Sequence, residues 1–300
     1  MDRANPKELA QWRARCGELR AGLVSTRRPA TLFRAGERWG YPLEAWSQLP
    51  DHDRQWLEVV AAGKGSTGSI LVGRSAARVH GMWVFPLGHE TVELSLRGGG
   101  SSPGRCAHPR YTFRHSRLRD SEIREVNGLL VTSAIRTFAD IARYHGFAEG
   151  LVAADWLRFR GLDADRLHRE ITDMGRLKGI GTVRRCAEYS NPVVDSGSES
   201  LARGLLITEG IGPLTPQYTI GGYRVDLLIG GWLIIEIDGA VKYRGPDAEA
   251  VRQREFNRQK EIANRGYVFL RYSPEFVRRT PHRSIAEVRE TLASRGRLRG

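Results

Sequence analysis

One stretch, residues 223–242, constrains the fold more than any other part of the chain. Its sequence, YRVDLLIGGWLIIEIDGAVK, places two apolar runs on either side of Gly230-Gly231. Val, Ile, Leu and Trp at this density, interrupted by a glycine pair, are typical of two antiparallel strands joined by a tight turn. The sequence therefore predicts a β-hairpin here.

Carboxylates lie on both strands of this hairpin. Asp226 is on the first, and Glu236 and Asp238 are on the second. Side chains alternate along a strand, so Glu236 and Asp238 should point the same way, while Ile235 and Ile237 point the opposite way. Folding at the glycine pair brings Asp226 level with Glu236. Three acids this close repel one another, and a divalent cation with oxygen ligands, such as Mg²⁺, is the natural partner.

The elements around the hairpin predict an α/β sandwich that spans residues 191–300. The linker-like run from Asn191 to Ser198 marks the boundary with a first region, residues 1–190. In chain order we expect a helix over 199–209, a strand over 216–220, the hairpin, a helix from Pro246-Asp247 to Arg265, a strand over 267–272 and a helix over 284–294.

The first region is predicted to be mixed α+β, followed by helices. Helices are expected over 6–19 and 51–62, strands between 91 and 131, and helices from Ser133, a fair N-cap, to Tyr189. Arg136 and Asp140 are four residues apart, which predicts a local ion pair. Basic residues alternate with apolar ones along one predicted strand: Arg110, Arg114, His115, Arg117 and Arg119. They form either a face that follows a phosphate backbone or a solvated face of the sheet.

Charge and composition point to a polyanionic partner. The 300 residues carry a net charge of +13, with a sequence pI of about 10.2. The three cysteines, Cys16, Cys106 and Cys186, form no CxxC pair, so neither a zinc knuckle nor a disulfide framework is indicated. No signal peptide or membrane span is evident, and we expect a soluble, cytoplasmic protein that binds DNA and no membrane.

The acids of the hairpin suit phosphodiester hydrolysis. That reaction needs a metal to polarise the phosphate and to acidify a water molecule. Asp226 and Glu236 are suited to bridge it, with help from the Ile237 carbonyl, and the cations available are Lys242, Arg252 and Arg258. A simpler reading is that such carboxylates only cap turns or pair with Arg. Charge within a strongly apolar strand is costly, however, which favours a function.

The same residues carry a family resemblance. Glu199 in the first helix, Val225-Asp226, I-E-I-D-G at 235–239 and G-Y-V-F-L-R at 266–271 resemble the PD-(D/E)xK restriction-endonuclease-like superfamily. More narrowly, they are similar to actinobacterial proteins related to very-short-patch-repair endonucleases. The resemblance implies a restriction-endonuclease-like α/β sandwich and a Mg²⁺-dependent (or Mn²⁺-dependent) endonuclease acting on DNA. The implied metal ligands are Glu199, Asp226 and Glu236.

Two positions depart from the family pattern. The family's lysine, two residues after the glutamate, is Asp238 here, and the usual histidine, three residues after the glycine, is Lys242. Lys242 is then either a migrated catalytic lysine or a sign that the site has drifted toward inactivity. The candidate catalytic residues are thus Asp226, Glu236, Asp238 and Lys242, and the candidate nucleic-acid-binding residues are Arg252, Arg258 and Arg271.

The first region resembles the antitoxin-like domain of abortive-infection systems. The similar segments are GRSAARVHGM, NGLLVTSAIRTFADIA and LVAADWLR, and they imply a regulatory, DNA- or partner-binding module. Three functions follow from the sequence: a metal-dependent DNA endonuclease, a non-catalytic antitoxin-like DNA-binding regulator that retains a decayed nuclease fold, and a structural scaffold. The sequence leaves open the oligomeric state and whether a toxin or a methylase is a protein partner.

Overall fold

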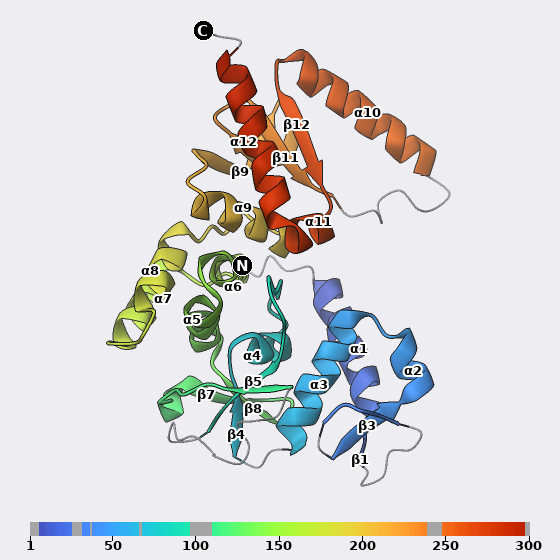
Figure 1. Ribbon diagram of the computed structural model, residues 1–300, viewed down its shortest axis with the longest axis vertical. Helices are drawn as coiled ribbons and strands as arrows, with labels where there is room; N and C mark the ends of the chain where they lie inside the picture. The colour runs from blue at the N-terminus through green and yellow to red at the C-terminus, as the bar shows by residue number, and fades with distance from the viewer. Residues whose placement is uncertain are drawn as a thin grey trace.

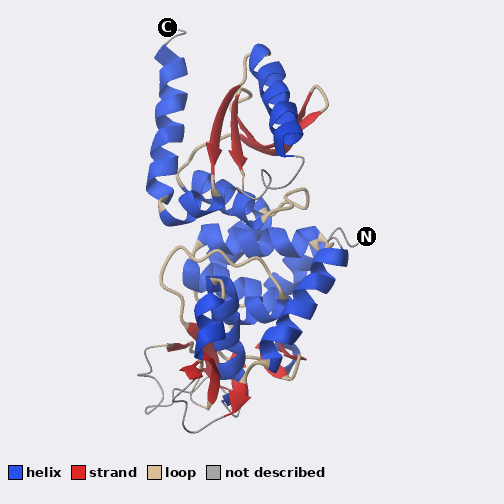
Figure 2. Ribbon diagram, turned by 90° about the vertical axis from the view of Figure 1, so that its right-hand side faces the viewer, coloured by secondary structure: helices blue, strands red, loops and turns tan. Residues whose placement is uncertain are grey.

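A computed structural model describes residues 6–25, 32–36, 38–65, 68–96, 110–238 and 248–297, and it contains three β-sheets in these ranges. Two sheets lie at one end of the molecule and the third at the other end, with helices between them (Figures 1 and 2). The architecture is mixed α/β, as predicted. Within the same ranges, no helix has both the length and the apolar character needed to cross a membrane.

The chain begins with a three-stranded sheet framed by helices. Leu19, Trp56 and Val60 contribute to one buried apolar core. Both helices predicted for this segment are confirmed, and each continues slightly further than expected. The elements are α1 (Pro6–Ala21), β1 (Val24–Ser25), β2 (Leu32–Arg34), β3 (Trp39–Pro42), α2 (Leu43–Gln48) and α3 (Asp51–Gly65), with strand order β1-β3-β2.

A five-stranded mixed sheet follows, with strand order β6-β5-β4-β8-β7. Its elements are β4 (Ser69–Leu71), α4 (Gly73–His80), β5 (Val92–Leu96), β6 (Tyr111–Phe113), a 3-10 helix η1 (Asp120–Glu122), β7 (Ile123–Val126) and β8 (Leu129–Thr132). The prediction of a long basic strand is wrong, because β6 ends at Phe113. Arg114 instead turns inward, and its Nη2 lies 2.5 Å from Oε1 of the buried Glu93.

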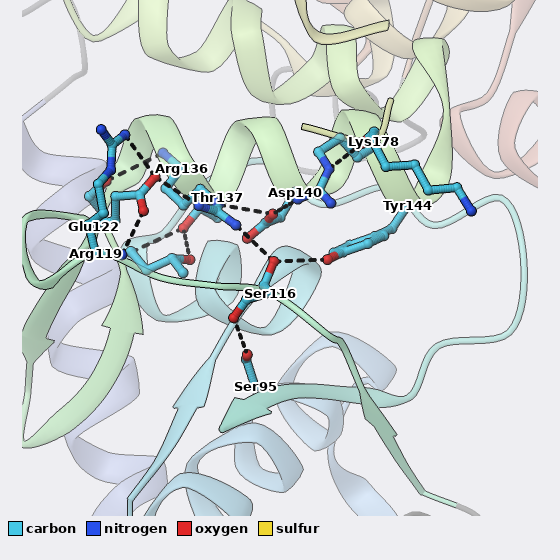
Figure 3. Close-up of polar contacts among 12 residues, drawn as sticks. Ser95, Ser116, Arg119, Glu122, Arg136, Thr137, Asp140, Tyr144 and Lys178 are labelled. Atoms are coloured by element: carbon cyan, nitrogen blue, oxygen red, sulfur yellow. Dashed lines mark hydrogen bonds and ion pairs between the residues drawn. The ribbon is translucent and has the colours of Figure 1, made fainter. Parts of the chain in front are cut away.

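Helices α3 and α4 pack on this sheet, and a further helical layer packs against α4 through α5 (Ala134–His145). This layer consists of α5, α6 (Phe147–Phe159), α7 (Ala164–Asp173) and α8 (Ile180–Tyr189). Ser133 caps α5, as predicted, by accepting a hydrogen bond from the Arg136 backbone N–H. The predicted ion pair is also present, with Arg136 Nε 3.1 Å from Asp140 Oδ1. Arg136 is buried and also donates to Glu122 and Ser116 (Figure 3), so this pair belongs to a larger network inside the protein.

The C-terminal part follows the predicted order of elements. They are α9 (Gly197–Thr208), β9 (Leu214–Ile220), β10 (Tyr223–Ile229), β11 (Leu233–Ile237), α10 (Ala248–Asn264), β12 (Val268–Tyr272), α11 (Pro274–Arg279) and α12 (Pro281–Arg297). The hairpin is confirmed, and both of its turn glycines, Gly230 and Gly231, have positive φ. The closing helix is longer than expected and follows a short extra helix.

The four-stranded sheet has the order β12-β11-β10-β9 and is covered on both faces. Leu227 and Ile235 pack on one face with residues of α9, α11 and α12, whereas Leu228 and Ile234 pack on the other with Ile262 of α10. Figure 2 shows the sheet between α12 and α10. Helix α9 also packs against α6, so the sheet is attached to the helical layer through this helix pair.

Candidate metal and nucleic-acid site

The first predicted metal ligand, Glu199, lies in the first turn of α9. Ser196 caps this helix, because its hydroxyl accepts a hydrogen bond from the Glu199 backbone N–H. The helix dipole favours an acid at this position. The Glu199 side chain, however, is directed toward the sheet rather than into solvent, since Gln217 Nε2 of β9 lies 2.5 Å from Glu199 Oε2.

A backbone irregularity in β9 brings Gln217 to Glu199. The β9–β10 ladder pairs Tyr218 with Val225 and Pro216 with Leu227. Between them Gln217 has φ 51°, a left-handed conformation that is uncommon for a residue other than glycine. Such a conformation redirects a side chain at the edge of a sheet. Sequence reasoning missed Gln217, and nothing in the local sequence signals this conformation.

Asp226 meets Glu199 on the α9 side of the sheet. Its Oδ2 accepts a 2.8 Å hydrogen bond from the Ile237 backbone N–H, which holds the carboxylate beside the end of β11. Glu199 and Asp226 line one small cavity whose apolar wall includes Ile235 and Ile237. The cavity has a volume of about 10 Å³, which is room for about one water molecule.

The proximity of the acids changes the protonation of Glu199. Burial, then the nearby charges of Asp226 and Asp195, raise the pKa of Glu199 to about 8. Carboxyl groups with a pKa raised this far are common in functional sites. Near neutral pH, Glu199 is thus mostly protonated unless a metal ion binds beside it.

Glu236 lies on the opposite face of the sheet from this cavity. It alternates with Ile235 and Ile237, which line the cavity, and points instead toward α10. Arg258 of α10 donates to Glu236 Oε1, and Arg271 Nη2 lies 2.6 Å from Glu236 Oε2. The second contact is an ion pair without hydrogen-bond geometry. The positive charge next to Glu236 is therefore supplied by two arginines.

Another acid, Glu255, belongs to this arginine cluster. Its Oε1 lies 2.7 Å from Arg258 Nη1 and also contacts Arg271. Asp238 is at the margin, with Oδ2 3.7 Å from Arg271 Nη1. Glu255 is not among the candidate site residues predicted from the sequence. Its spacing of three residues from Arg258 was the available signal for pairing.

The structure thus divides the predicted site residues into two groups. Glu199 and Asp226 share the cavity, whereas Glu236, Asp238, Arg258 and Arg271 form the arginine cluster. Lys242 lies outside the described residues, and the structure describes only the backbone of Arg252. In the part of the chain that the structure describes, no group of three His, Cys, Asp or Glu side chains is arranged to hold a metal ion.

The cavity residues fit a hard divalent cation in part. Mg²⁺ prefers oxygen ligands and keeps several of its waters, so two carboxylates beside a water-sized space provide a suitable donor set. The third predicted ligand does not fit in this arrangement, because both Glu236 oxygens contact arginines. Comparisons with protein-family models, curated proteins and solved structures found no match for this chain.

Proposed function

We propose that the C-terminal part of the chain is a Mg²⁺-dependent endonuclease with a restriction-endonuclease-like fold that acts on DNA. The observation that carries this proposal is the convergence of Glu199 and Asp226 on one small cavity, with the pKa of Glu199 raised to about 8. Two partly buried acids that repel each other are costly unless a cation offsets them. The cost is understandable if binding a cation is their function.

The roles of the residues follow from their positions. Glu199 and Asp226 would hold the metal, whose chemistry is to polarise a phosphate and to acidify a water molecule. The Ile237 N–H orients Asp226, and Gln217 orients Glu199. The overall charge of +13 would draw DNA to the protein at low salt. A toxin or a methylase is a proposed protein partner, and none of the described residues points to either one.

Plasmid cleavage in Mg²⁺ or Mn²⁺ tests this proposal. Asp226→Asn and Glu199→Gln should each lower the cleavage rate by roughly a hundredfold or more, because each removes a ligand charge. The matched control is Glu275→Gln, which removes an acid from a surface pair with Arg279 in the same part of the chain. Mn²⁺ binding, measured by calorimetry, gives a second readout. Wild-type protein that neither cleaves DNA nor binds Mn²⁺ would overturn the proposal.

A second function, DNA binding without hydrolysis, is favoured by the arginine cluster. Arg258 and Arg271 already neutralise Glu236, the third predicted metal ligand. Glu236 is therefore placed as a member of a structural ion-pair network rather than as a metal ligand. This function predicts DNA binding that weakens with salt, persists in EDTA and is unchanged by Asp226→Asn. The nuclease proposal predicts instead that the same substitution weakens metal binding and lowers the cleavage rate by roughly a hundredfold or more.

A further inference from the structure

One arginine near the cavity of Glu199 and Asp226 is open to solvent and has no role in the function proposed above. Arg224 is on β10, two residues before Asp226. Its side chain is 60% exposed, and its Nη2 lies 2.7 Å from Asp195 Oδ2. The backbone here is held in place, because the Arg224 carbonyl accepts a 2.9 Å hydrogen bond from Arg258 Nη2 of α10. Arg224 thus combines a fixed position on the sheet with a guanidinium that solvent can reach.

Asp195 connects this guanidinium to the carboxylates of the cavity. It lies in the segment just before α9, and its neighbour Val194 lines the cavity. The Gln217 side-chain amide contacts two acids at once, because its Nε2 donates to Glu199 Oε2 at 2.5 Å and to Asp195 Oδ1 at 3.4 Å. The guanidinium of Arg224 is therefore three contacts away from the carboxylate of Glu199.

The conformation of Gln217 supports a functional reason for these contacts. Its φ of 51° is unfavourable for a residue that carries a side chain. Strained conformations of this kind persist only where the surrounding structure fixes them, and they are concentrated at functional sites. Here the strained backbone directs the side-chain amide to both Glu199 and Asp195. Asp195 is therefore part of the site rather than an unrelated residue of a surface loop.

The ion pair between Arg224 and Asp195 is easily exchanged for a contact with another anion. Both side chains are well exposed, and such pairs contribute little to stability because water solvates both charges. Arg258 and Arg271, in contrast, are mostly buried and contact the buried Glu236. Of these three arginines, Arg224 is the one that a ligand from solution reaches with the smallest loss of existing contacts.

We propose that Arg224 binds a backbone phosphate of DNA near the cavity, and that Asp195 holds the same guanidinium until the phosphate displaces it. A carboxylate and a phosphate present similar oxygens to a guanidinium, which can donate two parallel hydrogen bonds to either group. Because Arg224 is two residues from Asp226, this contact would bring the DNA strand to the proposed metal ligands. The inference rests on the proposed function in taking DNA as the ligand, but the contact itself requires no metal.

Fluorescence anisotropy of a labelled DNA duplex, titrated with the full-length protein in EDTA, tests this proposal. EDTA prevents cleavage, so the measurement is independent of nuclease activity. Arg224→Gln should weaken binding by about fivefold or more, and should reduce the slope of log affinity against log salt concentration by about one, because one phosphate contact is lost. Arg224→Lys, which keeps the charge, should retain most of that slope. The side chain is exposed, so these variants should fold, and thermal melting checks that they do.

Asp195→Asn should have the opposite effect. It should tighten DNA binding by about threefold, because the phosphate no longer has to displace a carboxylate from the guanidinium. The tightening should disappear when Arg224→Gln is also present, as a double-mutant cycle would show. Tightening that persists in the double variant would mean that Asp195 only repels DNA, and it would overturn the proposed competition for Arg224.

A matched control pair lies on α7. Arg166 and Glu170 form an ion pair whose side chains are 63% and 41% exposed, close to the 60% and 38% of the Arg224 pair. Arg166→Gln and Glu170→Gln change the net charge by the same amounts, so they correct for general electrostatic attraction. Arg224→Gln protein that binds DNA like the Arg166→Gln control overturns the proposal, as does wild-type protein that binds no duplex. Failure of plasmid cleavage or of Mn²⁺ binding, in contrast, counts against the proposed nuclease function alone.

Discussion

Arg271 on β12 lies directly opposite Glu236 on β11 in the parallel ladder, and its Nη2 is 2.6 Å from Glu236 Oε2. Arg258 approaches the same carboxylate from α10. One buried acid thus joins the sheet to the helix that covers it. The pairing leaves two explanations for Glu236: a structural ion-pair centre, or a ligand that exchanges its arginines for a metal when DNA binds.

Replacing Glu236 with Gln should reveal how much the protein depends on this carboxylate. The substitution leaves two arginines close together, with Glu255 between them and Asp238 near Arg271. We expect the free energy of unfolding to fall by about 3 kcal/mol. Urea denaturation gives the value. The control, Glu275→Gln, breaks an exposed pair and should cost less than about 1 kcal/mol. Similar small effects for both variants would mean that the arginine cluster contributes little.

The raised pKa of Glu199 predicts a pH dependence of stability. Its folded-state pKa is about 8 against an ordinary value of 4.5, because burial and two aspartates disfavour its charge. The folded protein therefore holds a proton that the unfolded chain releases between these values. The contribution of Glu199 to the free energy of unfolding thus falls as the pH rises from 4.5 to about 8, by about 2–4 kcal/mol.

Glu199→Gln should remove this part of the pH dependence. The variant carries no titratable group at this position, so it should be more stable than the wild type at pH 8 and no more stable near pH 4.5. The measurement is urea denaturation of both proteins across this range. Parallel curves for the two proteins would show that Glu199 titrates normally.

Cation binding should also depend on the protonation of Glu199. Folding favours the protonated form of this carboxyl group, whereas cation binding favours the deprotonated form. A metal ion needs the deprotonated carboxylate of Glu199, so binding must release a proton below about pH 8. We expect Mn²⁺ affinity to rise with pH by up to about tenfold per unit, and then to level off near pH 8. Calorimetry in buffers of different ionisation enthalpy counts the released proton. Affinity that does not change between pH 6 and 8 would contradict a role for Glu199 as a ligand.

Much of the C-terminal fold could be predicted because its signals are local. Gly230-Gly231 fixed the hairpin, and alternation correctly placed Glu236 on the face away from Ile235 and Ile237. The partners of Glu236 could not be predicted, because they depend on how α10 crosses the sheet. The left-handed conformation of Gln217 was also missed, since tertiary contacts impose it against the residue's own preference.

The attachment of the C-terminal part to the helical layer is another feature that local signals do not show. Residues 191–198 were predicted as a linker; residues 191–196 do lie between α8 and α9, and residues 197 and 198 already belong to α9. Yet Asp155 of α6, fully buried, accepts hydrogen bonds from Arg203 and Ser200 of α9 and from the Asn191 backbone N–H. Helix α9 is therefore shared between the sheet and the helical layer, through contacts between residues about 45 positions apart.

Arg203→Met tests whether this shared helix couples the two parts of the chain. Arg203 Nη2 lies 2.8 Å from both Asp155 oxygens, and burial already raises the pKa of Asp155. Without the arginine, Asp155 is a buried and uncompensated charge, so we expect the free energy of unfolding to fall by about 3–5 kcal/mol. The exposed pair between Arg224 and Asp195 provides a control, and Arg224→Met should cost less than about 1 kcal/mol.

The double variant, Asp155→Asn with Arg203→Met, separates the ion pair from general damage to packing. It removes both charges, so it should be more stable than Arg203→Met alone, as a double-mutant cycle would show. We also expect Arg203→Met to lower the unfolding midpoint by the same amount whether it is measured by fluorescence or by circular dichroism. The reason is that the helix pair α6–α9 joins the C-terminal sheet to the helical layer, so the two should unfold together. Two separate transitions in the wild type, only one of which responds to the substitution, would show that the parts unfold independently.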